Sequence, residues 1–477
     1  MESRATARVA TVTRIQMRII SKSSDAHSEL RATIRLAVPV VFVQLGFMTM
    51  GVVDTLMVGR LSARMLAAVA LGNLYYFNVS IFGAGTLMAL DPIVAQAIGA
   101  GDNAAVARAV QRGLLIALGL SIATTLLFAP VTPILYALHQ QAEIVPDAAA
   151  YVRISIVGVL PYLSFVVLRQ SLQAMHRVAP IVWTVIVANL SNAGFNWVFV
   201  YGHLGSPVLG VAGSAIATAI SRWLMAGLLL ILAWRDLRPN LLPVRRDSWQ
   251  WRPIVRMLRI GVPIGGQQAL EIGAFGAIGL LMGVLGTVEM AAHQIAITLA
   301  ALTFMVPLGV ATAAAVRVGH AIGAGDDARA HAAIRAAYIA GVGFMTLTGI
   351  LFLTMPRLLA HAFTGDLRVV ALASALIPIA GVFQVFDGAQ AVGAGVLRGA
   401  GDTTAPLVVM LAAYWIVGVP VSAYLGFHTS LRAAGLWWGF VVSLAAVAGF
   451  LFLRIRVVFS RKLRRVSVEK HGDDTAN

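Results

Sequence analysis

The stretch Arg35–Pro39 (RLAVP) returns later in the chain as Arg259–Pro263 (RIGVP), and Ala97–Asp102 (AIGAGD) returns unchanged as Ala321–Asp326. Both pairs are separated by 224 residues. Two separate matches at one offset indicate two halves in one register rather than chance similarity. Paired halves are the usual construction of secondary transporters, whose substrate site lies between the halves near the middle of the bilayer.

The composition indicates an integral membrane protein. Hydrophobic residues make up 59% of the chain and charged residues 12%, whereas a soluble domain carries about 25% charged residues. The formal net charge of +16 is compatible with nucleic-acid binding. The basic residues gather at the ends of apolar segments, however, where they set topology, so we expect no nucleic-acid partner. The chain has no cysteine, which excludes disulfides and thiolate metal sites.

From Leu36 onward, apolar stretches of the length that a spanning helix needs alternate with short polar turns. They predict an all-α polytopic membrane protein with twelve helices, at about residues 35–58, 67–90, 110–136, 148–174, 180–202, 208–235, 260–285, 291–316, 333–355, 370–397, 405–427 and 433–458. The second and eighth helices can extend toward their AIGAGD turns.

The predicted helices divide into two lobes of six. An N-lobe covers residues 35–235 and a C-lobe covers 259–458, with a polar linker at 236–258 between them. Both lobes begin on the same side of the membrane, so they are parallel repeats related by an axis along the membrane normal. The basic segment 1–34 is expected to be a disordered tail, and residues 459–477 form a second basic tail.

The arginines predict the orientation. They are concentrated in the linker, in both tails and in the loops on the same side, as in Arg245-Arg246 and Arg464-Arg465. Loops rich in Lys and Arg face the cytoplasm. We therefore expect both termini and the linker to be cytoplasmic.

Three acidic residues lie inside the apolar runs: Asp54 in the first helix, Glu271 in the seventh and Asp387 in the tenth. A charged side chain at the centre of a membrane helix costs about 2.5–3.5 kcal/mol on insertion scales. Arg222 in the sixth helix is the only basic residue that the apolar runs offer nearby. The acids must then be protonated, hydrated in a cavity or bound to a cation, and each state suits binding of a cation or a proton.

A structural alternative exists for each acid, because a protonated carboxyl can simply link two helices by a hydrogen bond. The acids do not recur between the halves, since Asp54 aligns with Ile278 and Glu271 with Phe47. A structural acid would more plausibly recur in both halves, so a functional role is favoured. Asp91, near the inner end of the second helix, is better explained as a solvated or structural carboxylate.

Polar side chains in the fifth and sixth helices are weaker candidates. Asn192 and Asn196 are four residues apart and share one helix face. Unpaired amides in lipid are costly, so they need partners, and structural bonding between helices is an equal alternative. Thr218 can satisfy its hydroxyl on its own helix. Pro39 and Pro263, at matched positions, free a backbone carbonyl and allow each first helix to bend as a gate; a tolerated kink is the alternative.

The sequence shows no motif of catalysis or of metal binding. The AIGAGD turns lack the Lys-Ser/Thr of a phosphate-binding loop. No His pair has metal-ligand spacing, and no Ser or His lies in a nucleophile motif. We therefore expect no enzymatic activity, no cofactor and no structural metal.

Five stretches carry a resemblance to a known family. They are Val53–Gly59 (VDTLMVG), Leu87–Gln96 (LMALDPIVAQ), Ala292–Ala296 (AHQIA), Arg317–His320 (RVGH) and Gly395–Gly399 (GVLRG). In these stretches the chain resembles the MATE (multidrug and toxic compound extrusion) family, and within it the NorM-like branch of bacterial exporters. The similarity covers about residues 30–458.

The resemblance implies two lobes around a central cleft and export of organic cations in exchange for Na⁺ or H⁺. It implies an N-lobe cation site of Asp54, Asn192, Asn196 and Thr218. It also implies a C-lobe acidic pair of Glu271 and Asp387, which would bind substrate together with Asp54. Pro39 corresponds to the first-helix proline that is linked to bending.

The same resemblance implies a monomer in the bacterial inner membrane, with small organic cations and the bilayer as its partners. Two residues depart from the pattern: Phe383 stands where a tyrosine is expected, which puts a direct cation contact there in doubt, and Asp91 stands where an uncharged residue is expected. The alternative function is a flippase for a lipid-linked saccharide, from the same wider superfamily. That function favours a cationic cleft, whereas the buried acids of this chain are anionic.

Overall fold

A computed structural model describes residues 2–466 and 468, with side chains from Ser28 onward. Twelve of its helices are long and apolar enough to cross a membrane. The described residues contain no β-strand. The predicted all-α polytopic fold with twelve spans is therefore confirmed.

The N-lobe consists of nine α-helices and one 3₁₀ turn that together form six spans. They are α1 (Glu2–Gly59), α2 (Ala63–Leu87), α3 (Leu90–Gly99), α4 (Asn103–Phe128), α5 (Val131–Ala137), α6 (Val145–Ser155), η1 (Ile156–Gly158), α7 (Val159–Ala174), α8 (Ala179–Tyr201) and α9 (Gly210–Leu232). Helices α2 and α3 form one span, and α6, η1 and α7 form another.

A short linker, α10 (Trp234–Leu241) and η2 (Arg246–Trp249), leads to the C-lobe. The C-lobe consists of α11 (Trp251–Leu285), α12 (Thr287–Gly323), α13 (Asp327–Thr354), α14 (Pro356–His361), α15 (Leu367–Gly399), α16 (Thr404–Met410), the π-helical segment η3 (Leu411–Gly418), α17 (Val419–Phe427) and α18 (Arg432–Phe459). The segments α16, η3 and α17 form one span.

The repeated AIGAGD stretch makes the same turn in both lobes. Gly101 and Gly325 adopt positive φ angles of 70° and 69°, which glycine reaches without steric cost. The Asp that follows caps the next helix: Asp102 accepts a bond from the Ala105 amide and Asp326 one from the Arg329 amide, both at 2.9 Å. The second and eighth spans reach Gly99 and Gly323 and thus extend to these turns, as expected.

The lobes pack against each other reciprocally. Helix α1 of the N-lobe packs on α12, and the corresponding α11 of the C-lobe packs on α2. At the turns, a Cβ atom at Gly99 would overlap the carbonyl oxygen of His320, and one at Gly323 would overlap that of Gln96. The first helix of each lobe thus packs on the second span of the other lobe. This exchange indicates an internal two-fold relation between the lobes.

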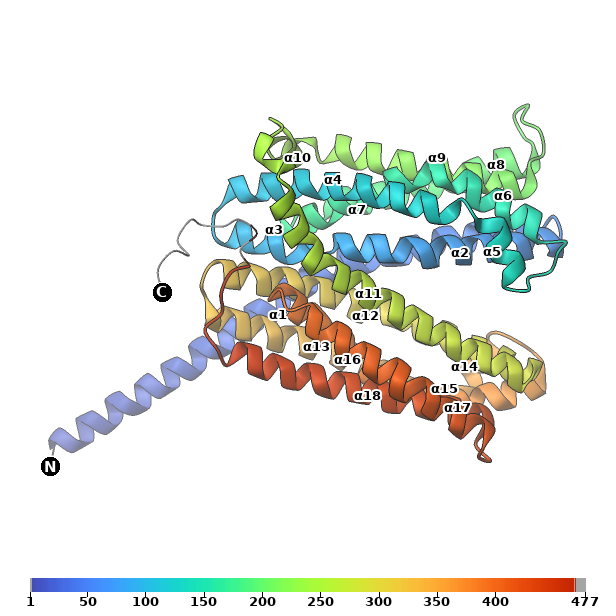
Figure 1. Ribbon diagram of the computed structural model, residues 1–477. Helices are drawn as coiled ribbons and strands as arrows, with labels where there is room; N and C mark the ends of the chain where they lie inside the picture. The colour runs from blue at the N-terminus through green and yellow to red at the C-terminus, as the bar shows by residue number, and fades with distance from the viewer. Residues whose placement is uncertain (1, 467, 469–477) are drawn as a thin grey trace.

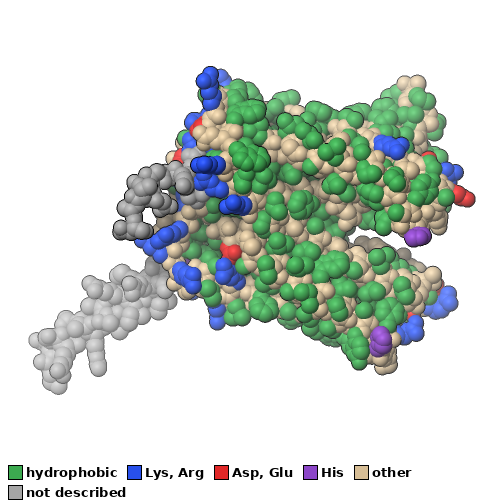
Figure 2. Space-filling model, viewed as in Figure 1, with side chains coloured by type: hydrophobic (Ala, Val, Ile, Leu, Met, Phe, Trp, Pro, Cys, Tyr) green, Lys and Arg blue, Asp and Glu red, His purple; other side chains and the backbone are tan. Residues whose placement is uncertain are grey.

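The lobes meet at one end and diverge at the other. In Figure 1 they lie one above the other, in contact near α3 and spread apart toward the end where α5, α6 and α14 lie. Figure 2 shows an open notch between them at that far end, whereas Lys and Arg side chains gather around the closed end. In this view the lobes are therefore in contact at one end and separated by a notch at the other.

The structure differs from the sequence prediction at the start of the chain and at the linker. Helix α1 is helical from Glu2, where a disordered tail through residue 34 was expected. The buried Glu29 anchors its described part, because it pairs with Arg317 and, at 3.2 Å, with Arg329 of the C-lobe. The seventh span begins at Trp251, so much of the expected 236–258 linker is helical. Of the expected tail 459–477, residues 467 and 469–477 lie outside the described residues.

Candidate cation sites

Three helices of the N-lobe converge on Asp54. Asn196 of α8 donates from Nδ2 to Asp54 Oδ1 at 2.7 Å, and Thr218 of α9 donates from Oγ1 to Oδ2 at 2.9 Å. Asp54 lies on α1, and only 3% of its surface is exposed. Residues that are 142 and 164 positions away in sequence thus satisfy both oxygens of one buried carboxylate.

Asn192 completes this cluster on the same face of α8. Its backbone oxygen accepts the Nδ2 group of Asn196 at 2.9 Å. The side-chain oxygens of both asparagines are buried and have no hydrogen-bond partner among the described residues. Together with the Asp54 carboxylate they form a set of oxygen acceptors, the ligand type that hard cations prefer. The residues present therefore fit a small cation.

The C-lobe holds the other two acids. Glu271 lies on α11 and Asp387 on α15, and the two side chains are close enough to repel each other electrostatically. Gln390 donates to Glu271 Oε1 over a long 3.5 Å, and Asp387 Oδ1 is buried without a hydrogen-bond partner. Two neighbouring carboxylates, Asp387 buried and Glu271 half-buried, with so few donors favour the uptake of a proton or a cation.

Aromatic side chains form one wall beside this pair. Phe383 is fully buried and lies 5.9 Å from the ring of Phe275 and 5.5 Å from that of Trp437. It has no hydroxyl to offer a cation. Tyr414 was missed by the sequence reasoning; it is buried on the π-helical segment η3, its hydroxyl lacks a partner, and it interacts electrostatically with both acids. An apolar run does not show which of its side chains face inward, so no signal in the sequence pointed to Tyr414.

The three acids do not form one cluster. Asp54 belongs to the N-lobe group, whereas Glu271 and Asp387 face each other in the C-lobe, and no hydrogen bond joins the two groups within the described chain. Pro39 and Pro263 lie inside the unbroken helices α1 and α11, so each lobe keeps one first helix with a freed carbonyl.

The closed end is held by contacts that we call the closed-end seam, formed by Asp91, Gln96 and His176 of the N-lobe with His320, Arg398 and Gly399 of the C-lobe. Asp91 is completely buried and pairs with Arg398 at 3.6 Å. Gln96 donates to the Gly399 oxygen at 2.9 Å. The rings of His176 and His320 stack 4.7 Å apart. The structural interpretation of Asp91 thus matches its position, although the residue is not solvated.

His176 follows α7, outside the spans, and its charge state depends on the seam. Partial burial against His320 lowers the pKa of His176 below the ordinary value of 6.5, and the nearby Arg317 and Arg329 lower it further. The neutral ring is therefore the form that the closed seam favours.

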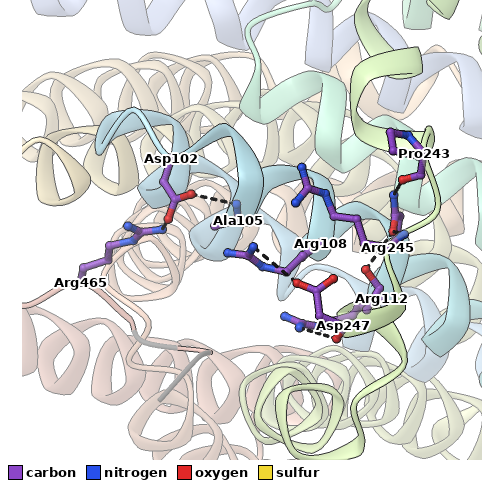
Figure 3. A network of polar contacts seen from close by, with 10 residues as sticks. Asp102, Ala105, Arg108, Arg112, Pro243, Arg245, Asp247 and Arg465 are labelled. Carbon is purple, nitrogen blue, oxygen red and sulfur yellow. Dashed lines mark hydrogen bonds and ion pairs between the residues drawn. The ribbon is translucent and has the colours of Figure 1, made fainter. Parts of the chain in front are cut away.

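The linker is fixed to the same end of the N-lobe. Gln111 of α4 donates to the Pro243 oxygen at 3.0 Å and accepts from the Arg245 amide at 3.0 Å. One turn away, Arg108 pairs with Asp247 at 3.6 Å, and Figure 3 shows this pair near the Asp102–Arg465 pair. The connection between the lobes is thus bound to α4 rather than free.

The family comparison covers both lobes. The MatE family model matches residues 39–198 and 263–424. Among similar proteins, the probable multidrug resistance protein NorM of Mesorhizobium japonicum is 40% identical, and the match covers 89% of this chain and 93% of that protein. The multidrug resistance protein MdtK of Edwardsiella ictaluri is 32% identical, with 90% and 95% covered.

Solved structures share the fold at low identity. The eukaryotic MATE transporter AtDTX14 superposes with a TM-score of 0.83 at 22% identity, covering 91% of this chain and 96% of that one. An outward-facing multidrug resistance transporter of the MATE family, within the MOP superfamily, gives a TM-score of 0.81 at 20% identity, with 91% and 96% covered.

Proposed function

The chain belongs to the MATE family, and we propose that it exports organic cations, including drugs and other toxic compounds, from the cytoplasm in exchange for Na⁺ or H⁺. The Asp54 cluster is the observation that supports this most directly. It offers one carboxylate and two amide oxygens within the membrane-spanning part of the N-lobe. The hydrogen-bond donors to the carboxylate, Asn196 and Thr218, belong to the same lobe. The two amide oxygens have no hydrogen-bond partner among the described residues, so they are free to bind a cation.

The protein is a multi-pass protein of the bacterial inner membrane, and its substrates are small molecules. We place the closed, Arg-rich end in the cytoplasm, because the positive-inside rule assigns basic loops to that side. The notch of Figure 2 then opens outward. Both termini are cytoplasmic in this orientation, and the protein acts as a monomer.

In the transport cycle, an organic cation from the cytoplasm occupies the cleft of the inward-open state, where Asp54, Glu271 and Asp387 supply negative charge. A coupling ion that enters through the outward opening competes for the same carboxylates and promotes release. The closed-end seam must separate before the cytoplasmic side can open, because its contacts join the two lobes. Bending of α1 at Pro39 accompanies this change.

The test is efflux of ethidium from proteoliposomes under an imposed Na⁺ gradient at fixed pH, and then under a pH gradient without Na⁺. Movement driven by Na⁺ would identify the Asp54 cluster as an ion-coordinating site. Movement driven only by pH would make the carboxylates proton carriers. Movement under neither gradient contradicts the proposal and favours a flippase for lipid-linked saccharides.

A further inference from the structure

An arginine lies beside the N-lobe cation site and has no part in the mechanism described so far. Arg222 is on α9, four residues after Thr218, so the two side chains leave the same face of the helix one turn apart. Thr218 donates its hydroxyl to Asp54. Arg222 therefore lies on the same face of α9 as Thr218, the hydrogen-bond donor to Asp54.

Aromatic rings, not a carboxylate, hold this guanidinium. Its Cζ atom lies 3.9 Å from the centre of the Tyr76 ring and 5.8 Å from that of Tyr162. Its stem passes so near to η1 that a Cβ at Gly158 would lie 2.9 Å from Arg222 Cδ. Rings and backbone thus fix the position of the charge.

The charge is otherwise uncompensated. Nη1 of Arg222 is buried without a hydrogen-bond partner, and within the described part of the chain Arg222 takes part in no ion pair. It does interact electrostatically with Asp54 and with the buried Tyr151 beside it. A guanidinium inside a membrane span is expensive, so its presence near the acid calls for a function.

We propose that Arg222 is the fixed counter-charge of the Asp54 site and sets the affinity of that site for every transported cation; this inference rests on the proposed function. With the site empty, the guanidinium offsets the charge of the carboxylate without bonding to it. When a cation binds, it meets a second positive charge, carried by a residue one helical turn from Thr218 on α9. That repulsion weakens the binding of organic cation and coupling ion alike, so each can displace the other.

The experiment measures ethidium binding to the purified protein by fluorescence anisotropy, with NaCl or acid as competitor. Replacing Arg222→Gln removes the charge and should tighten ethidium binding roughly tenfold or more, because two charges one turn apart in a partly buried site interact strongly. Replacing Arg222→Lys keeps the charge and should leave the Kd within about threefold of the wild type.

Three further variants separate this effect from a structural one. Arg169→Gln removes another buried arginine of the N-lobe, which lies over Phe47 at 5.6 Å and does not touch Asp54, and should leave the Kd unchanged. In an Asp54→Asn background, Arg222→Gln should give no gain in affinity. Tyr76→Leu releases the guanidinium toward Asp54 and should weaken binding, the opposite direction.

Unchanged or weaker ethidium binding by a folded Arg222→Gln protein overturns the inference. If that variant does not fold, the Tyr76→Leu variant provides the test. Unchanged or tighter ethidium binding by Tyr76→Leu would also contradict the inference. The proposed function fails differently: the wild type itself would then move no ethidium under either gradient. If the wild type transports ethidium but Arg222→Gln binds it with unchanged affinity, the counter-charge inference is wrong and the proposed function stands.

Discussion

The two lobes share one fold but treat their buried acids differently. Asp54 in the N-lobe receives two short hydrogen bonds and has a guanidinium nearby. Glu271 and Asp387 in the C-lobe face each other with one 3.5 Å hydrogen bond between Glu271 and Gln390. The N-lobe carboxylate therefore receives more hydrogen bonding from the protein than the C-lobe pair does.

The internal repeat explains why both arrangements can exist on one scaffold. At the position of Asp54 the C-lobe has the buried Ile278, and at the position of Glu271 the N-lobe has Phe47. The halves kept the residues that shape turns and helix packing, such as the AIGAGD turns, while their interiors diverged. The two repeats therefore share their architecture, whereas the residues of their binding sites differ.

The largest expected effect comes from removing a charge at either site. Asp54→Asn and Asp387→Asn should each reduce ethidium efflux from proteoliposomes by about a hundredfold, because each variant lacks one of the carboxylates at which substrate and coupling ion are exchanged. Both should remain folded, since an amide fills the same volume. Wild-type efflux by a well-expressed Asp387→Asn protein would show that the C-lobe pair is dispensable.

A stability measurement separates the two sites most sharply. In the absence of organic cations and Na⁺, at about pH 8, Asp387→Asn should stabilise the protein by about 1 kcal/mol, because it removes the repulsion from Glu271. Asp54→Asn should destabilise it by about 1–3 kcal/mol, because an amide leaves one of two donors without an acceptor.

Thermal melting in detergent gives both values. Equal shifts of the same sign in the two variants would contradict the contrast between the lobes. The variant Glu271→Gln is the matched control, because it removes the same repulsion from the other partner and should behave as Asp387→Asn does.

The closed-end seam gives the next largest effect. Asp91→Asn removes one partner of a buried pair and leaves Arg398 uncompensated, which costs several kcal/mol in buried sites. Because the chain has no cysteine, a single Thr86→Cys substitution reports on opening: Thr86 is buried where α2 meets α11. Labelling by a membrane-impermeant maleimide from the cytoplasmic side should become at least about tenfold faster in the Asp91→Asn protein.

Asp402→Asn is the control for that experiment. It breaks the 2.6 Å pair of Asp402 with Arg454, which lies within the C-lobe and is partly exposed. It should not alter the labelling rate. Equal rates in the Asp91→Asn and Asp402→Asn proteins would mean that the Asp91–Arg398 pair does not hold the lobes together.

The smallest expected effect is a pH dependence of the same labelling. The closed seam lowers the pKa of His176 below 6.5, through burial and the nearby Arg317 and Arg329. The closed state is thus fully favoured above about pH 6.5 and loses stability as the pH falls below it, because the open state binds the proton more readily. Between pH 7.5 and 5.5 labelling of Thr86→Cys should rise roughly threefold, and His176→Gln should abolish that rise while leaving the pairing of Glu29 in place.

Much of the architecture followed from local patterns. Apolar runs of spanning length predicted twelve helices, and two matched stretches predicted the two lobes, because helix length and repeat offset are properties of contiguous residues. The acids Asp54, Glu271 and Asp387 were identified for the same reason, since a charge within an apolar run is visible without any partner. The pairing of Glu29 with Arg317 was not predicted, because the two residues lie 288 positions apart in the sequence.

Partners, in contrast, were decided by the tertiary structure alone. Only the rotation of α8 and α9 relative to α1 brings Asn196 and Thr218 onto the two oxygens of Asp54. Only the contact of the lobes joins Asp91 to Arg398, and only the packing of η3 brings Tyr414 near the C-lobe acids. By itself the sequence determined which segments cross the membrane and which residues are costly there. The packing of those segments decided which partner stabilises each of these residues. The partners depend on helix rotations and lobe contacts, which no local sequence pattern encodes.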